Sequence, residues 1–156
     1  LNLITNYDIV ADGSDNFTTR FLVNDACKLA SKTLVSGALS QFDGQVSTFK
    51  PFATNGSPCY RCIYPTPPPP GLAPSCAEAG ILGALAGVVG SMQAVEILKE
   101  IVGIGESLSG SLMLYEALSA TWRKVKVKKD PKCALCGEHP TIHDLSQFED
   151  KAAEQN

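Results

Sequence analysis

The pattern of apolar and polar positions at the start of the chain predicts a strand, a helix and a second strand. Tyr7–Asp12 is a short apolar run with an acidic end, which is typical of a buried parallel strand. Apolar residues recur at steps of three and four over Phe17–Lys32, which predicts an amphipathic helix. Thr33–Ala38 indicates a second buried strand, so residues 7–38 are expected to form a parallel unit with a right-handed crossover. The polar side chains expected on the solvent face of the helix are Arg20, Asn24, Asp25 and Lys28.

Later segments predict antiparallel strands added to this parallel unit. Gln45–Phe49 follows an Asp-Gly turn signal and alternates, which favours a strand with one exposed face. Ser111–Tyr115 and Thr121–Val127 predict a hairpin-like pair. The expected fold class is therefore α/β.

The stretch Ala79–Val102 is long and mostly apolar. Four polar or charged residues interrupt it, namely Gln93, Glu96, Lys99 and Glu100. They argue against a membrane span. Four glycines recur at helical spacing, namely Gly80, Gly83, Gly87 and Gly90. Because each glycine costs a helix about 1 kcal/mol relative to alanine, we expect another backbone to approach this face, in a buried central helix near a subunit interface.

Composition sets the broad class of the protein. The 156 residues favour one domain over residues 1–141, followed by a polar tail or linker at 142–156. A net charge of −3 gives no electrostatic case for a nucleic-acid partner. The chain opens without methionine or a signal-peptide pattern, close to its first strand, so we expect a cytoplasmic protein of which this is a fragment.

Two cysteine pairs with the same spacing, Cys59/Cys62 and Cys133/Cys136, predict a four-thiolate zinc site. Two residues between ligands let one tight turn direct both thiolates at the same point. Such a closed site stabilises a fold and leaves no open position for a substrate. A redox dithiol formed by Cys59 and Cys62 alone is the alternative.

The other two cysteines have different settings. Cys27 lies inside the amphipathic helix, where a small packed side chain is expected. Cys76 follows a proline-rich crossover at residues 65–74 and precedes the long helix. A helix N-terminus lowers the pKa of a thiol, so Cys76 is a candidate nucleophile as well as a candidate non-catalytic thiol.

Two carboxylates flank a Gly-Ser turn at the end of the first strand. Ligands of open parallel sheets bind at this edge, and Asp12 and Asp15 offer oxygen atoms that could hold magnesium beside a nucleotide phosphate. The same residues also make a good helix-capping turn. Spacing alone leaves both interpretations open.

Several ordered motifs together resemble the MoeB/ThiF/HesA family, the bacterial relatives of ubiquitin-activating enzymes. The resemblance extends from about Tyr7 to Thr141 and is closer to MoeB-type than to ThiF-type proteins. The motifs that carry it are Asp12–Arg20 with Asn24, Leu34–Ala38, Gly44–Val46, Cys59–Cys62, Ser75–Gly80 and Gly90–Ala94.

The resemblance implies the carboxyl-terminal part of a Rossmann-like ubiquitin-activating-enzyme fold. It further implies an ATP-dependent adenylyltransferase that activates the C-terminal glycine of a small ubiquitin-like sulfur carrier. The carrier of molybdopterin synthase is preferred over those of other pathways, and a homodimer is expected.

Individual residues are assigned from the matching motifs. The resemblance implies that Asp15 works with magnesium and ATP, and that Asn16 and Arg20 support its loop. It also places Cys76 where some members hold a cysteine that joins the carrier covalently or takes part in sulfur transfer.

The family's glycine-rich nucleotide loop, its catalytic arginine and its phosphate-binding lysine belong upstream of the first strand. This chain alone is therefore expected to lack full adenylation activity. The alternative function is a zinc-stabilised carrier-binding module without catalysis.

Overall fold

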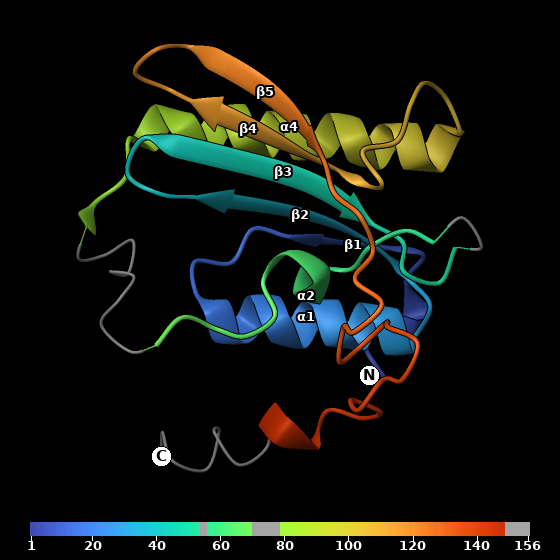
Figure 1. The fold of residues 1–156 in the computed structure, drawn as a ribbon. Coiled ribbons are helices and arrows are strands. Elements are labelled where there is room, and N and C mark those ends of the chain that lie inside the picture. The colour runs from blue at the N-terminus through green and yellow to red at the C-terminus, as the bar shows by residue number, and fades with distance from the viewer. Residues whose placement is uncertain (54–55, 70–78, 149–156) are drawn as a thin grey trace.

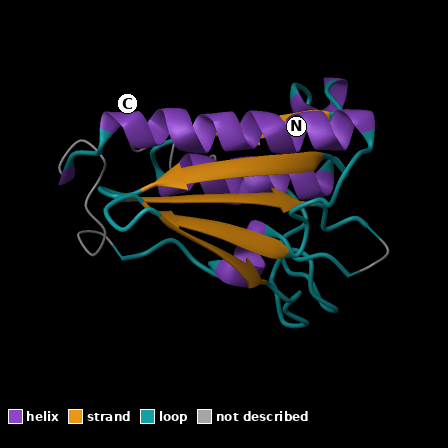
Figure 2. Ribbon diagram, turned by 90° about the horizontal axis from the view of Figure 1, so that it is seen from above, coloured by secondary structure: helices purple, strands orange, loops and turns teal. Residues whose placement is uncertain are grey.

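A computed structural model describes residues 1–53, 56–69 and 79–148. These residues form one five-stranded mixed sheet with helices on both faces (Figures 1 and 2). The order of the strands in the sheet is β1-β2-β3-β4-β5. The elements are η1 (Ile4–Asn6), β1 (Ile9–Asp12), α1 (Phe17–Leu29), β2 (Thr33–Leu39), β3 (Asp43–Phe49), α2 (Tyr60–Ile63), α4 (Gly83–Val102), β4 (Ser111–Glu116), β5 (Thr121–Lys126) and η2 (Ser146–Phe148).

The predicted parallel unit is confirmed, with one shorter helix. Strands β1 and β2 are parallel, and Asp12 is paired with Ser36. Helix α1 ends at Leu29 because Ser31 takes a left-handed conformation, with φ 55°. The backbone N–H of Lys32 then donates to the carbonyl of Cys27. This Schellman arrangement satisfies carbonyls at the helix end without the glycine that usually signals it.

The remaining strands are antiparallel, and the predicted β4–β5 hairpin is confirmed. The prediction that the third strand exposes one face is wrong. From Val46 to Phe49 every residue of β3 is buried. Strand β3 lies in the middle of the sheet, and both of its faces are covered. Helix α4 covers one face and helices α1 and α2 cover the other (Figures 1 and 2).

Alternate side chains of the strands pack into two separate cores, one on each face of the sheet. Leu34 packs on the α1 side, whereas its neighbour Val35 packs on the α4 side. Burying each large apolar side chain contributes about 1.5–3 kcal/mol. The α1 core contains Phe21, Cys27, Leu34, Phe49 and Tyr60, and the α4 core contains Val35, Val46, Leu85, Val89 and Leu108.

Polar residues of α1 depart from the predicted solvent face. Arg20, Asn24 and Asp25 are buried, so their assignment to the surface is wrong. They face the α2 turn and the loop after β1, which supply hydrogen-bond partners. A prediction from apolar periodicity places polar residues on the exposed face. Here these polar residues are buried, because distant segments provide hydrogen-bond partners for them.

Helix α4 is not the buried central helix that its apolar sequence predicts. Its buried residues are Leu85, Val89 and Glu96, and its outer side is solvent-exposed and apolar. An added Cβ at the helix glycine Gly87 would meet no atom within 4 Å. Among the described residues, no helix combines the length and the apolar character needed to cross a membrane. The exposed large apolar side chains of the outer side are Val95, Leu98, Ile101 and Val102.

Candidate active site and metal centre

The loop after β1 is held by its own side chains and by α1. Asp12 Oδ1 accepts a hydrogen bond from the backbone N–H of Ser14 at 3.0 Å. Arg20 donates from Nε and from a terminal nitrogen to the Ser14 carbonyl oxygen at 3.0 and 2.8 Å. The guanidinium group therefore fixes the turn backbone next to Asp15. The assigned role of Arg20 in cofactor binding stays a prediction.

Asn16 is the N-cap of α1. Its Oδ1 accepts from the backbone N–H of Thr19 at 2.8 Å, and its Nδ2 donates to Asp15 Oδ1 at 3.3 Å. Such a cap contributes about 1 kcal/mol to a helix. The capping interpretation of the turn is thus observed. It leaves the Asp15 carboxylate exposed, where it can also reach a ligand.

A cavity of about 310 Å³ opens beside this loop, and we call it the Asp15 pocket. It lies at the carboxyl ends of the parallel strands β1 and β2, where ligands of open α/β sheets bind. Helix α4, the loop after β1, the end of β2 and Arg20 of α1 all contribute to its lining. The lining residues are Gly13, Ser14, Asp15, Arg20, Gly37, Ala38, Leu39, Ile81, Ala86, Val89, Gly90 and Gln93.

Two polar atoms of the same turn are buried and lack partners among the described residues. These atoms are Asp12 Oδ2 and Ser14 Oγ. A buried polar atom without a hydrogen bond costs about 1–3 kcal/mol. The turn therefore retains unused hydrogen-bonding capacity close to Asp15, which is common at binding sites.

The four paired cysteines meet in space, as their spacing predicts. Their sulfur atoms all lie within 4.8 Å of one another, and the closest separations are 3.3 to 3.9 Å. Tetrahedral zinc with Zn–S bonds of about 2.3 Å requires sulfur atoms roughly 3.8 Å apart. Disulfide bonds are far shorter, at about 2.05 Å. We call Cys59, Cys62, Cys133 and Cys136 the four-cysteine cluster, and its geometry fits zinc.

The protonation of the four-cysteine cluster depends on whether a cation is bound. Hydrogen bonds from Cys136 and then Cys59 lower the pKa of Cys133, which favours a thiolate there. The hydrogen bond shared with Cys133 raises the pKa of Cys59. Opposite shifts on neighbouring thiols mean that they share protons. Four thiolates can coexist at this separation only when a cation neutralises them.

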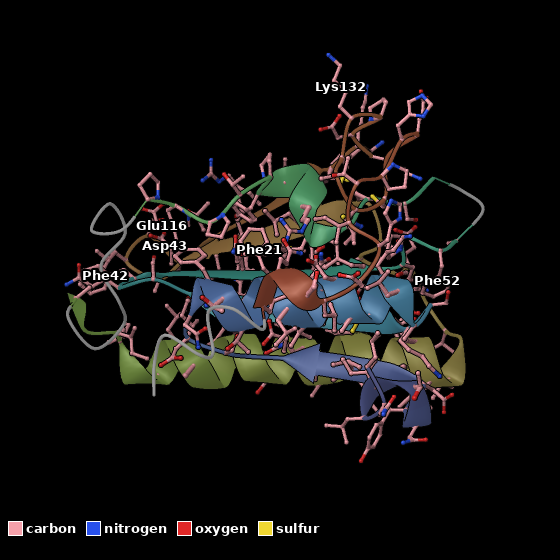
Figure 3. The ribbon with its side chains drawn as sticks, turned by 90° about the horizontal axis from the view of Figure 1, so that it is seen from below. Phe21, Phe42, Asp43, Phe52, Glu116 and Lys132 are labelled. Atoms are coloured by element: carbon pink, nitrogen blue, oxygen red, sulfur yellow. The ribbon has the colours of Figure 1, made fainter. Side chains whose placement is uncertain are left out.

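Local backbone geometry positions both cysteine pairs. Cys59 is the N-cap of the short helix α2, which contains Cys62. The second pair lies in a tight turn, where an added Cβ at Gly137 would approach the backbone of Cys133 closer than 3.0 Å. Glycine is therefore required there. Lys132, labelled in Figure 3, precedes this turn and points away from the molecule.

The first cysteine pair is fastened to α1 through buried polar groups. Arg61 donates from Nε and a terminal nitrogen to the two carboxylate oxygens of Asp25, at 2.8 and 2.7 Å. The side-chain oxygen Oδ1 of Asn24 accepts a hydrogen bond from the backbone N–H of Tyr60 at 2.9 Å. Phe21, labelled in Figure 3, lies between them, 5.2 Å from the Tyr60 ring and 4.6 Å from the Arg61 guanidinium. The four-cysteine cluster and the helix that follows the Asp15 loop therefore form one connected unit.

Of the two remaining cysteines, the structure describes only Cys27. Cys27 is buried in the α1 core, as predicted, and burial followed by the negative charge of Asp12 raises its pKa to about 12. Cys76 lies outside the described residues, so its assignment as a nucleophile stays a prediction. The expected tail from residue 142 is in contact with the domain up to Phe148, which packs on the α1 core.

Gln93 is a polar residue of the Asp15 pocket to which the sequence assigns no site role. Gln93 belongs to the Gly90–Ala94 motif of the family resemblance, where it enters only as a polar interruption of an apolar helix. A single amide on the buried side of such a helix is itself a signal, because an amide there needs specific partners.

Comparisons with known proteins agree with this geometry. The profile of the ThiF family matches residues 1–135. A sulfur carrier protein adenylyltransferase of Thermus thermophilus is 53% identical over 96% of this chain, and the match covers 56% of that protein. An adenylyltransferase and sulfurtransferase MOCS3 of Sus scrofa is 47% identical over 96% of this chain, and the match covers 32% of that protein. The chain thus spans about half of the first relative and a third of the second.

Solved structures agree on the fold. The crystal structure of E. coli MccB with MccA-N7isoASN superposes with a TM-score of 0.68 at 15% identity, covering 83% of this chain and 41% of that one. At this identity the likeness concerns the fold alone. Together with the match over residues 1–135, it confirms the expected α/β architecture. This chain belongs to the ThiF family.

Proposed function

We propose that this chain carries part of an ATP-dependent adenylyltransferase that activates the C-terminal glycine of a small ubiquitin-like sulfur carrier. The observation that carries the proposal is the Asp15 pocket, which combines an exposed carboxylate, a buried arginine and the carboxyl edge of parallel strands. The printed names of the Thermus and Sus scrofa relatives support this reaction class.

The proposed reaction joins the carrier carboxylate to the α-phosphorus of ATP. One carboxylate oxygen forms a bond to phosphorus, the bond to the bridging oxygen breaks, and pyrophosphate leaves with that electron pair. Magnesium would neutralise phosphate charge and orient the α-phosphate. Asp15 would hold it, with Asp12 nearby, because carboxylate oxygens are its preferred protein ligands. Asn16 and Arg20 keep the loop in place for this role.

We assign zinc at the four-cysteine cluster a structural role. Four thiolates fill a tetrahedral site, so no position is left for a substrate. The ion pair between Asp25 of α1 and Arg61 of α2 links the cluster to α1. This assignment disfavours the redox alternative, since Cys59 and Cys62 would then not be free as a dithiol.

We propose a homodimer in which the outer side of α4 is covered. Small and apolar residues recur there at steps of three and four, the spacing of close helix pairs. They are Ala84, Gly87, Ser91, Ala94, Leu98 and Ile101. Leu98→Glu should turn a dimer into a monomer in light scattering, whereas Lys124→Glu on β5 should not. Equal masses for wild type and Leu98→Glu would contradict this assignment.

The identity of the carrier is the most specific part of the proposal. The MoeB-like motifs favour the carrier of molybdopterin synthase. The paired cysteines, as metal ligands, favour a cytoplasmic setting, where thiolates stay reduced. Cys76 is proposed as a thiol that acts after adenylylation. Sulfur transfer by the encoded protein should fall when Cys76 is replaced by Ala, while adenylylation itself persists.

One experiment separates the enzyme from a carrier-binding module without catalysis. ATP–pyrophosphate exchange and carrier binding are measured on this chain alone and on the encoded protein with whatever precedes Leu1. We expect carrier-dependent exchange in the encoded protein and none in the chain alone. Carrier binding that needs no ATP, together with absent exchange in both proteins, would favour the binding module instead.

A further inference from the structure

Gln93 on α4 has a side-chain amide whose orientation is fixed by the strands below it. Its Nε2 donates to the backbone carbonyl oxygens of Asp12 at 2.9 Å and Val35 at 3.3 Å. Both partners are acceptors only, so the NH₂ group must face them and the carbonyl oxygen Oε1 must face away. The Nε2 group therefore links β1 and β2, and Oε1 is left as an acceptor that these two carbonyls do not use.

Gly37 makes this arrangement possible. A Cβ at Gly37 would lie closer than 3.0 Å to the amide of Gln93, so any larger residue would displace it. Oε1 is itself one of the atoms that a Cβ at Gly37 would meet, and it lies 3.8 Å from the position that a Cβ would take at Gly13. Gln93 is also one of the residues that line the Asp15 pocket. Its acceptor therefore lies near Gly37 and Gly13, two other residues that line the pocket.

The acceptor has no protein partner in the part of the chain that the structure describes. Its neighbours on the α4 wall of the pocket are the apolar Ala86, Val89 and Gly90. A ligand that covers Oε1 without donating a hydrogen bond leaves it unpaired, at a cost of about 1–3 kcal/mol. A site of this kind selects ligands that carry an N–H or O–H group at the matching position.

We propose that Gln93 contacts the reactant in the Asp15 pocket and that Oε1 accepts a hydrogen bond from its N–H or O–H group. This inference rests on the proposed adenylylation. Two donors share the required chemistry, namely the peptide N–H of the carrier's C-terminal glycine and a ribose hydroxyl of ATP. Nε2 has a separate task, since it holds the strand ends that carry the Asp15 loop.

Two variants separate the acceptor from the donor. Gln93→Lys keeps a donor for the two carbonyls and removes the acceptor, whereas Gln93→Met removes both. Gln45→Met is the matched control, because Gln45 is also half-buried and accepts one hydrogen bond from Tyr64, but lines a different cavity of about 240 Å³. All four proteins are assayed as encoded, with whatever precedes Leu1.

The readouts are kcat and the KM values for ATP and for the carrier in ATP–pyrophosphate exchange, with Tm measured in parallel. Loss of one hydrogen bond should raise one KM about 10-fold in both Gln93 variants and leave it unchanged in Gln45→Met. A raised carrier KM identifies the peptide N–H. A raised ATP KM identifies a ribose hydroxyl. In that case deoxy-ATP should have a higher KM than ATP in the wild type, and the two KM values should be similar in Gln93→Lys.

Two outcomes overturn the inference in distinguishable ways. If the wild type exchanges and Gln93→Lys has unchanged KM values, Gln93 contacts no reactant, even when Tm falls. If the wild type shows no carrier-dependent exchange, the proposed function fails and this inference fails with it.

Discussion

Replacing Arg61 by Met is expected to lower the free energy of unfolding by about 3–5 kcal/mol. The Asp25 side chain is completely buried, and Arg61 is its only charged partner among the described residues. Met keeps the aliphatic length of Arg61 but removes the charge. The Asp25 carboxylate would then be buried with only two amide donors, Asn24 Nδ2 and Gln147 Nε2, both at 3.0 Å.

The magnitude follows from this geometry. Two charge-assisted hydrogen bonds of 2.7 and 2.8 Å are lost together with the contact of the guanidinium on Phe21. For a domain of this size, the loss corresponds to a decrease of about 6–20 °C in Tm. The double variant Asp25→Leu/Arg61→Met should recover part of the loss, because no unpaired charge stays buried.

Urea unfolding with zinc present measures these differences, and Glu106→Gln is the control. Glu106 pairs with Lys124 at 3.7 Å while 91% exposed, so its loss should cost less than about 1 kcal/mol. The reasoning is refuted if Arg61→Met costs no more than Glu106→Gln. It is also refuted if the double variant is no more stable than Arg61→Met.

Three further predictions concern the metal, a buried thiol and a strand glycine. Metal analysis of the protein should find one zinc per chain, and a strong chelator should lower Tm and expose four thiols to alkylation, whereas four unreactive thiols after metal removal would contradict the site. Burial raises the pKa of Cys27 from 9.0 to about 12, so its stabilising contribution is complete below pH 9 and is lost as pH rises from 9 to 12. Cys27→Ala should flatten that part of the curve of unfolding free energy against pH, and an unchanged slope would argue against the shift. Gly37→Ala should destabilise the fold by about 1–3 kcal/mol, as overpacking does, and Gly83→Ala, which meets no atom within 4 Å, should not lower stability in urea unfolding.

The elements of the fold could be predicted where local patterns are strong. Apolar periodicity predicts β1, α1 and β2, and the alternation of β4 and β5 predicts their hairpin. Equal cysteine spacing predicts that two segments more than 70 residues apart meet. These signals succeed because each depends on a local pattern that only one arrangement satisfies.

Burial could not be predicted in the same way, because it depends on partners distant in sequence. Asp25 looks like a surface residue until Arg61 provides its counter-charge. The α4 glycines predict close packing, yet the close approach to α4 occurs at the strand glycines Gly37 and Gly44. The task of Gln93 likewise depends on the carbonyl of Asp12, which lies on another element.

The central claim is that the Asp15 pocket is the site of carrier adenylylation. Its most direct test is carrier-dependent ATP–pyrophosphate exchange by the encoded protein, comparing wild type with Asp15→Asn and with Asp8→Asn, an exposed carboxylate outside the pocket. We expect exchange in wild type and Asp8→Asn, and a loss of about 100-fold or more in Asp15→Asn. Exchange that is equally fast in Asp15→Asn, or absent from the wild type, would contradict the claim.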